Sequence, residues 1–139
     1  MSAMDNTADA RITAFLVEDS LPIRERLVAL LAGTHGIMVV GEADTPQRAV
    51  EGILRTRPDS VVLDIHLAGG SGLEVLKAVR PRAPGTLFIV LTNHPDSQYR
   101  RVFTDAGASA FLDKSTQFDL IVETILAGAT RRLQIPNLQ

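Results

Sequence analysis

Acidic residues stand directly after two apolar runs of the chain. ITAFLV, residues 12–17, is followed by Glu18 and Asp19, and SVVL, residues 60–63, is followed by Asp64. A carboxylate at the end of a buried strand loses much of its hydration and therefore needs a partner. The partner can be local: Asp64 could cap the next helix or pair with a lysine, and the first acidic pair could cap the first helix.

Two other polar side chains end later apolar runs. Thr92 closes TLFIVLT, residues 86–92, and Lys114 follows SAFLD, residues 109–113. If these ends share one edge of a sheet, three carboxylates, a hydroxyl and an ammonium converge there. Crowded carboxylates raise one another's pKa unless a cation lies among them. Mg²⁺ suits such a site, because it accepts oxygen ligands, keeps several waters and binds phosphate oxygens.

This set of side chains is suited to phosphoryl transfer. Asp64, beside a metal and facing Lys114, is placed as a nucleophile toward phosphorus. Thr92 can donate to one phosphoryl oxygen, and Lys114 can neutralise another as a point charge. Taken alone, Thr92 is better explained as a strand-end hydroxyl that satisfies the backbone.

The elements that would carry these residues alternate along the chain. The apolar runs are mostly continuous, as parallel strands covered on both faces require. We expect strands at residues 12–17, 37–43, 60–64, 86–92 and 109–113, and helices that begin near Ser20, Thr45, Ser71, Ser97 and Gln117. Parallel neighbours need right-handed crossovers, so this order predicts an α/β fold with a doubly wound, five-stranded parallel sheet. Sites in such sheets lie at the carboxyl ends of the strands.

Composition limits the classes of function. The chain has 139 residues, which fits one domain, and a net charge of -2, which gives no field to attract nucleic acid or an anionic membrane. The absence of cysteine removes disulfides and thiolate chemistry and favours a cytoplasmic location. No segment reaches the length of a membrane span. We expect a flexible arm at 1–10, the domain at 11–130, and a tail or linker start at 131–139.

Four motifs together resemble the receiver domain of two-component response regulators. They are LVED at 16–19, VVLDIHLAGGSGLEVL at 61–76, IVLTNH at 89–94 and AFLDKS at 110–115. The resemblance covers about residues 11–130 and rests on their joint spacing. It implies a flavodoxin-like (βα)5 fold with strand order 2-1-3-4-5. It also implies a signalling switch rather than an enzyme, with at most self-phosphorylation from small donors and auto-dephosphorylation.

The resemblance implies a role for each residue of the site. Asp64 would be the phospho-acceptor, Asp19 the direct Mg²⁺ ligand, Glu18 an acidic residue often acting through water, His66 a ligand through its backbone carbonyl, Thr92 the switch hydroxyl, Lys114 the phosphate-binding lysine and Phe111 the rotating switch aromatic. The alternative role for Phe111 is that of a plain core aromatic.

The resemblance also implies partners. The phosphoryl group would come from a phosphohistidine on a sensor histidine kinase or phosphotransfer protein. As Thr92 moves toward the phosphate, Phe111 would turn inward and change the face made by the fourth helix, fifth strand and fifth helix. That face would bind a downstream protein target, and the chain would be a monomer or a weak dimer through it. We expect no direct contact with nucleic acid or a membrane.

Several residues depart from the family's usual pattern. Ala68 and Ser115 stand where proline is usual, and Asn93 stands where a small residue is usual. Asn93 could narrow access to the phosphate. His66 and His94 lie near the site in sequence, and their simplest interpretation is a solvent-facing position on the rim. All three are candidates for tuning the rates of phosphorylation and hydrolysis.

Other functions share this architecture. The chain could be a binding module that no longer depends on phosphorylation, or the receiver piece of a longer DNA-binding regulator. A dehalogenase-like phosphatase is disfavoured, because it needs a second acid two residues after the nucleophile, where this chain has His66. A flavodoxin-like electron carrier is disfavoured, because VEDSLP places acids where a hydroxyl-rich phosphate loop is required.

Overall fold

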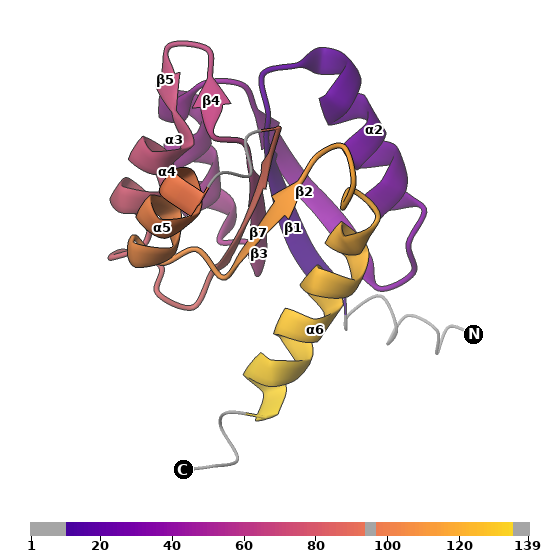
Figure 1. Ribbon diagram of the computed structural model, residues 1–139. Helices are drawn as coiled ribbons and strands as arrows, with labels where there is room; N and C mark the ends of the chain where they lie inside the picture. The colour runs from indigo at the N-terminus through magenta and orange to yellow at the C-terminus, as the bar shows by residue number, and fades with distance from the viewer. Residues whose placement is uncertain (1–10, 94–96, 135–139) are drawn as a thin grey trace, which may run out of the picture.

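A parallel sheet forms the centre of the protein (Figure 1). The computed structural model describes residues 11–93 and 97–134. The strands of this sheet are β1 (Ile12–Val17), β2 (Ile37–Ala43), β3 (Ser60–Leu63), β6 (Leu87–Thr92) and β7 (Ala110–Asp113). Their spatial order is β2-β1-β3-β6-β7, and every neighbouring pair is parallel. Numbered along the chain, this order is 2-1-3-4-5, so the predicted fold class and strand order are confirmed.

Helices cover both faces of the sheet. They are α2 (Leu21–Ala32), α3 (Pro46–Thr56), α4 (Gly72–Val79), α5 (Ser97–Asp105) and α6 (Leu120–Gln134). Leu27 of α2 and Ile121 of α6 belong to the apolar core on one face, whereas Ile53 of α3 and Leu76 of α4 belong to the core on the other. Because both faces are covered, the central strands are apolar throughout rather than at alternate positions.

Polar side chains fix where the first helices begin. The Ser20 hydroxyl accepts a hydrogen bond from the Ile23 amide at 3.5 Å, and the Thr45 hydroxyl accepts one from the Arg48 amide at 3.2 Å. These are N-caps, which satisfy amides that have no partner within the helix. Ser71 is the N-cap of α4. The predicted helix starts near these three residues are confirmed.

The structure differs from the expected elements after β3 and before α6. Between β3 and α4, where no strand is expected, the chain forms a two-stranded antiparallel hairpin of β4 (His66–Leu67) and β5 (Gly70–Ser71). Gly69 turns this hairpin with a φ of 83°, in the left-handed region that glycine enters at little cost. The last helix begins at Leu120 rather than near Gln117.

In both α5 and α6, an exposed apolar residue lies beside a buried one. Val102 of α5 keeps 43% of its surface exposed and Leu126 of α6 keeps 36%, although their neighbours Phe103 and Ile125 are buried. A helix covers a sheet with one stripe only, and these two residues lie outside it.

The last helix extends beyond the expected end of the domain. Helix α6 continues to Gln134, past the predicted domain boundary at residue 130. The predicted arm at 1–10, His94 and residues 135–139 of the predicted tail lie outside the described residues.

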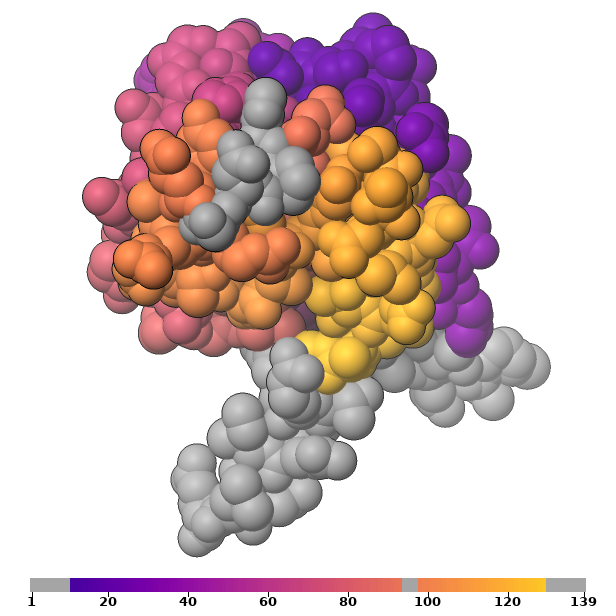
Figure 2. Space-filling model, viewed as in Figure 1, coloured from indigo at the N-terminus to yellow at the C-terminus, as the bar shows by residue number. Residues whose placement is uncertain are grey.

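One broad face of the molecule is built by α5 and α6. They lie on either side of β7 in Figure 1, and the same face is turned toward the viewer in Figure 2, with α5 in orange and α6 in yellow. Both helices pack against β7. Within the described ranges, no helix has the length and apolar character required to cross a membrane.

Candidate functional site

The register of β1 and β3 brings the acidic residues together. Val17 pairs with Leu63 across the two strands, and the Asp64 amide donates to the Val17 carbonyl at 3.0 Å. Glu18 and Asp64 therefore leave the sheet at adjacent points. One carboxylate oxygen from each of Glu18, Asp19 and Asp64 lies within 4.8 Å of the others. The predicted convergence of these three carboxylates is confirmed.

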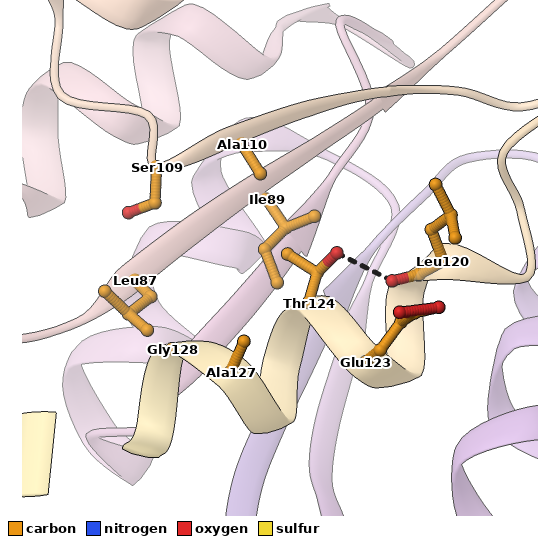
Figure 3. A pocket seen from close by; sticks show the side chains of 9 residues that line it. All are labelled: Leu87, Ile89, Ser109, Ala110, Leu120, Glu123, Thr124, Ala127 and Gly128. Carbon is orange, nitrogen blue, oxygen red and sulfur yellow. Dashed lines mark hydrogen bonds between the residues drawn. The ribbon is translucent and has the colours of Figure 1, made fainter. Parts of the chain in front are cut away.

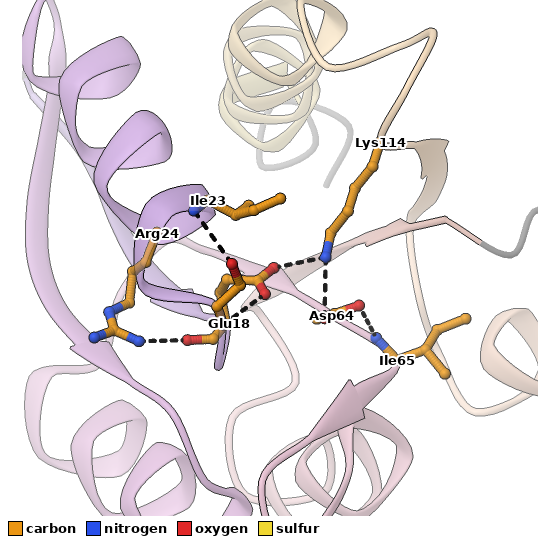
Figure 4. A network of polar contacts seen from close by, with 7 residues as sticks. Glu18, Ile23, Arg24, Asp64, Ile65 and Lys114 are labelled. Carbon is orange, nitrogen blue, oxygen red and sulfur yellow. Dashed lines mark hydrogen bonds and ion pairs between the residues drawn. The ribbon is translucent and has the colours of Figure 1, made fainter.

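Lys114 reaches into this cluster from the end of β7. Its backbone amide donates to the Thr92 carbonyl at 2.8 Å, which ties the loop after β7 to the end of β6. Its Nζ lies 2.9 Å from Glu18 Oε1 and 3.1 Å from Asp64 Oδ2 (Figure 4). Only 8% of the Lys114 side chain is exposed. The lysine partner that the sequence suggests for Asp64 is therefore present, and it contacts two carboxylates.

The electrostatics of the cluster favour additional positive charge. Burial raises the pKa of Glu18, the hydrogen bond from Lys114 opposes this shift, and the negative charge of Asp64 adds to it. Burial disfavours the charged form of Lys114, but its contacts with Glu18 and Asp64 outweigh burial and raise its pKa. The ammonium is therefore charged at neutral pH. One such charge faces two largely buried carboxylates, and the exposed Asp19 adds a third.

Backbone amides orient the two inner carboxylates. Glu18 Oε2 accepts a hydrogen bond from the Ser20 amide at 3.0 Å, and Asp64 Oδ1 accepts one from the Ile65 amide at 2.7 Å. Among the residues that the structure describes, none forms a hydrogen bond or ion pair with the Asp19 carboxylate. All three side chains offer oxygen ligands. Two of the carboxylates are held in place and the third is open to solvent. This arrangement fits a hard divalent cation.

The other predicted site residues lie around this cluster at different depths. Thr92 is fully buried at the end of β6, two residues beyond Val90, which pairs with Leu63 of β3. Asn93 follows it and is exposed. His66 is exposed on β4, and its ring meets the Tyr99 ring edge-on with centroids 5.8 Å apart. The solvent-facing interpretation of His66 is confirmed, whereas its backbone carbonyl as a metal ligand stays a prediction.

Phe111 is a core residue in this conformation. It keeps 6% of its surface exposed, and its ring packs against Phe103 with centroids 6.3 Å apart. The Arg100 guanidinium carbon lies 4.9 Å from the centre of the Phe111 ring. Arg100 of α5 therefore covers an aromatic ring. The rotation of Phe111 on phosphorylation stays a prediction.

Sequence reasoning missed Arg24, which contacts the site from α2. Its Nη1 donates to the Glu18 carbonyl at 2.6 Å (Figure 4). Its Nε lies 3.1 Å from Glu42 Oε1. A signal was available, because Arg24 shares a helix face with the buried Leu27 and Leu31. A charged residue on an apolar stripe requires a specific partner.

A pocket elsewhere in the molecule is separate from these site residues. It has a volume of about 350 Å³ and lies between α6 and the strands β6 and β7 (Figure 3). Its walls include Leu87, Ile89 and Ala127, and none of the clustered carboxylates nor Lys114 lines it. The candidate site is instead an open rim at the carboxyl ends of β1, β3 and β7.

Comparison with known proteins agrees with this geometry. Residues 14–126 match the family model of the response regulator receiver domain. The DNA-binding transcriptional activator DevR/DosR of Mycobacterium tuberculosis is 33% identical over 103 residues, which are 74% of this chain and 48% of that protein. A protein-glutamate methylesterase/protein-glutamine glutaminase of Syntrophus aciditrophicus is 31% identical over 74% of this chain and 30% of its own length. The chain thus spans about half or less of these relatives.

Solved structures agree as well. A two-component response regulator of the LuxR family from Aurantimonas sp. SI85-9A1 has a TM-score of 0.78 and 30% identity, covering 85% of this chain and 86% of that one. The response regulator domain of Thermotoga maritima CheB has a TM-score of 0.76 and 25% identity, covering 87% and 95%. With the family model matched over most of its length, the chain belongs to the response regulator receiver domain family.

Proposed function

We propose that the protein is a signalling switch that accepts a phosphoryl group on Asp64 in the presence of Mg²⁺. The observation that carries the proposal is the environment of the Asp64 carboxylate. One oxygen is held by the Ile65 amide at 2.7 Å, the other by the Lys114 ammonium at 3.1 Å, and two further carboxylates lie beside it. A buried carboxylate that is oriented, paired and clustered in this way is suited to receive a charged group with its metal.

Glu18, Asp19 and Asp64 would hold the Mg²⁺, together with the backbone carbonyl of His66. Two observations support these ligands. The donor set consists of oxygen atoms only, and the described residues place a single ammonium among three carboxylates. When bound, Mg²⁺ supplies positive charge that stabilises the phosphoryl oxygens beside the carboxylates. Among the described residues, Lys114 is the cation that contacts Glu18 and Asp64.

Transfer of the phosphoryl group requires little covalent chemistry from the protein. An Asp64 carboxylate oxygen attacks phosphorus, and the new O–P bond forms as the N–P bond of the donor phosphohistidine breaks, its electron pair staying on the imidazole nitrogen. The Ile65 amide fixes the plane of the attacking carboxylate. Lys114 offers a positive charge next to the acceptor, and Thr92 would donate its hydroxyl to a phosphoryl oxygen.

The output of the switch is a change in protein binding. We infer that phosphorylation draws Thr92 toward Asp64 and biases the packing of Phe111 beneath the face formed by α5, β7 and α6. A downstream protein would bind this face, and the chain would be a monomer or a weak dimer through it. A sensor histidine kinase or phosphotransfer protein in the cytoplasm is the proposed donor. The net charge of -2 supports a protein rather than a nucleic acid as the direct partner.

Chemical phosphorylation tests the acceptor. The protein is incubated with Mg²⁺ and a small acyl-phosphate or phosphoramidate donor, and its intact mass is measured. Wild type should gain one phosphoryl group, whereas Asp64→Asn should gain none, because an amide oxygen is a poor nucleophile toward phosphorus. Chelation of Mg²⁺ should suppress the adduct on wild type.

Asp105→Asn is the matched control. It removes a carboxylate from an exposed position at the end of α5 and should leave the adduct unchanged. Wild-type protein that is folded and binds Mg²⁺, yet gains no phosphoryl group from either donor, would contradict the proposal. The phosphorylation-independent binding module would then be the better interpretation, with Asn93 the first residue to exchange.

A further inference from the structure

Arg24 joins three segments that meet behind the carboxylate cluster. It lies in the first turn of α2, and only 17% of its side chain is exposed. Its Nη1 donates to the Glu18 carbonyl at 2.6 Å, in the loop between β1 and α2. Its Nε lies 3.1 Å from Oε1 of Glu42, which pairs with Leu16 near the end of β2. One side chain thus connects a helix, a loop and a strand.

The contact with the Glu18 carbonyl completes the fixation of that residue. The Glu18 amide donates to the Ala43 carbonyl at 3.0 Å, Oε1 meets Lys114, and Oε2 accepts from the Ser20 amide. With Arg24 at the carbonyl, every polar atom of Glu18 has a partner. A residue held at its amide, its carbonyl and both carboxylate oxygens cannot rotate without breaking several hydrogen bonds.

The same contact orients the next residue, Asp19. The Glu18 carbonyl and the Asp19 amide belong to one planar peptide group, so a hydrogen bond to that oxygen sets the orientation of the peptide from which Asp19 extends. The Asp19 carboxylate itself has no hydrogen bond or ion pair within the described part of the chain. Its direction toward Asp64 therefore depends on its backbone, and the Glu18–Asp19 peptide is the part that Arg24 holds.

We propose that Arg24 is a positioning residue for the metal site, acting on Asp19 through the Glu18 carbonyl, with Glu42 holding its guanidinium. This inference rests on the proposed function. Arginine fits the task because its planar fork donates in two directions at once, to the carbonyl and to the carboxylate. Glu42 also balances the Arg24 charge, which would otherwise lie close to a cation site.

Mg²⁺ affinity measured on the folded, unphosphorylated protein tests the proposal. Arg24→Met keeps the buried stem but removes both donors, and it should raise the Kd for Mg²⁺ about 10-fold, as the loss of a group that orients a metal ligand typically does. Arg24→Lys keeps the charge without the fork and should also weaken binding. Glu42→Gln should have a smaller effect, because the amide oxygen can still accept from Nε.

Arg48→Met is the matched control. Arg48 also forms an ion pair near the end of β2, with Asp44 at 3.5 Å, but its side chain is 74% exposed. Among the described residues, it forms no hydrogen bond or ion pair with the loop after β1. The control should bind Mg²⁺ as wild type does. In the metal-free Arg24→Met protein, the Asp19 amide resonance should shift in an NMR spectrum, whereas in Arg48→Met it should not.

The outcomes separate the inference from the proposed function. If wild type binds no Mg²⁺, the proposed function itself fails. If wild type binds Mg²⁺ and Asp19→Asn loses it, but folded Arg24→Met binds with an unchanged Kd, the role of Arg24 is refuted while the metal site stands. A lower Tm of Arg24→Met with unchanged Mg²⁺ affinity would likewise assign Arg24 to stability alone.

Discussion

One lysine side chain contacts two carboxylates that have little access to water. Glu18 keeps 1% of its surface exposed and Asp64 keeps 8%, and the Lys114 ammonium lies within 3.1 Å of an oxygen on each. Removing one partner of a buried ion pair is costly, because the remaining charge keeps its desolvation penalty. Lys114 is therefore a stabilising residue as well as a candidate phosphate ligand.

In Mg²⁺-free buffer at pH 8, Lys114→Met should lower the free energy of unfolding by about 3 kcal/mol. The loss should shrink as the pH falls toward 5. The pKa of Glu18 is already raised by burial, and without the opposing hydrogen bond from Lys114 it rises further. A carboxyl group whose pKa is raised in the folded state adds stability at pH values below its unfolded pKa, and this stability is lost as the pH rises through the folded pKa. Urea unfolding at the two pH values measures the difference.

Lys77→Met is the control for Lys114→Met, because it makes the same substitution at an exposed lysine. Lys77 is exposed on α4, so its replacement should change stability by less than about 0.5 kcal/mol at either pH. An equal loss at pH 5 and pH 8 for Lys114→Met would show that Glu18 does not protonate in the variant. The electrostatic account of the cluster would then be wrong.

Helix α4 begins in direct contact with Asp64 and Ile65, the residues that follow β3. The Gly72 amide donates to the Ile65 carbonyl at 2.7 Å, and a Cβ at Gly72 would overlap the Asp64 carbonyl oxygen. Gly72→Ala should therefore displace the Asp64 backbone, lower the free energy of unfolding by about 2 kcal/mol and slow phosphorylation from a small donor. Thermal unfolding and the rate of adduct formation by mass spectrometry test both effects.

Gly69→Ala separates a local clash from general loop strain. Gly69 has a φ of 83°, which disfavours a side chain, but a Cβ there would meet nothing within 4 Å. The substitution should cost about 1 kcal/mol and leave the phosphorylation rate near that of wild type. If both alanine variants phosphorylate at the wild-type rate, the close approach at Gly72 has no role in placing Asp64.

The elements show how far the sequence could predict this protein. Continuous apolar runs and polar N-caps predicted the strands, three helix starts and the edge where the carboxylates meet, because these depend on local burial and local hydrogen bonds. The exposure of Val102 could not be predicted, since periodicity records apolar residues but not the width of the surface that covers them. The contact of Arg24 with the Glu18 carbonyl depends on three segments that only the tertiary fold brings together.

The carboxylate cluster exists only in the folded molecule. Glu18 and Asp19 follow β1, Asp64 follows β3, and the pairing of these strands brings their oxygens within 4.8 Å. The unfolded chain keeps Glu18 and Asp19 adjacent but loses Asp64, so its affinity for a divalent cation is far lower. A cation bound by the folded state alone stabilises the fold by mass action.

Mg²⁺ should therefore stabilise the wild-type protein against unfolding. At a concentration tenfold above its Kd, the free energy of unfolding should rise by about 1.4 kcal/mol, and further tenfold increases should add about the same amount. Asp19→Asn should lose most of this dependence, because it removes the carboxylate that is open to solvent, whereas Asp105→Asn should retain it. Urea unfolding across a Mg²⁺ series, with ionic strength held constant by KCl, makes the measurement. Equal stabilisation of wild type and Asp19→Asn would mean that Mg²⁺ acts elsewhere on the protein, and the assignment of the cluster as a metal site would have to be abandoned.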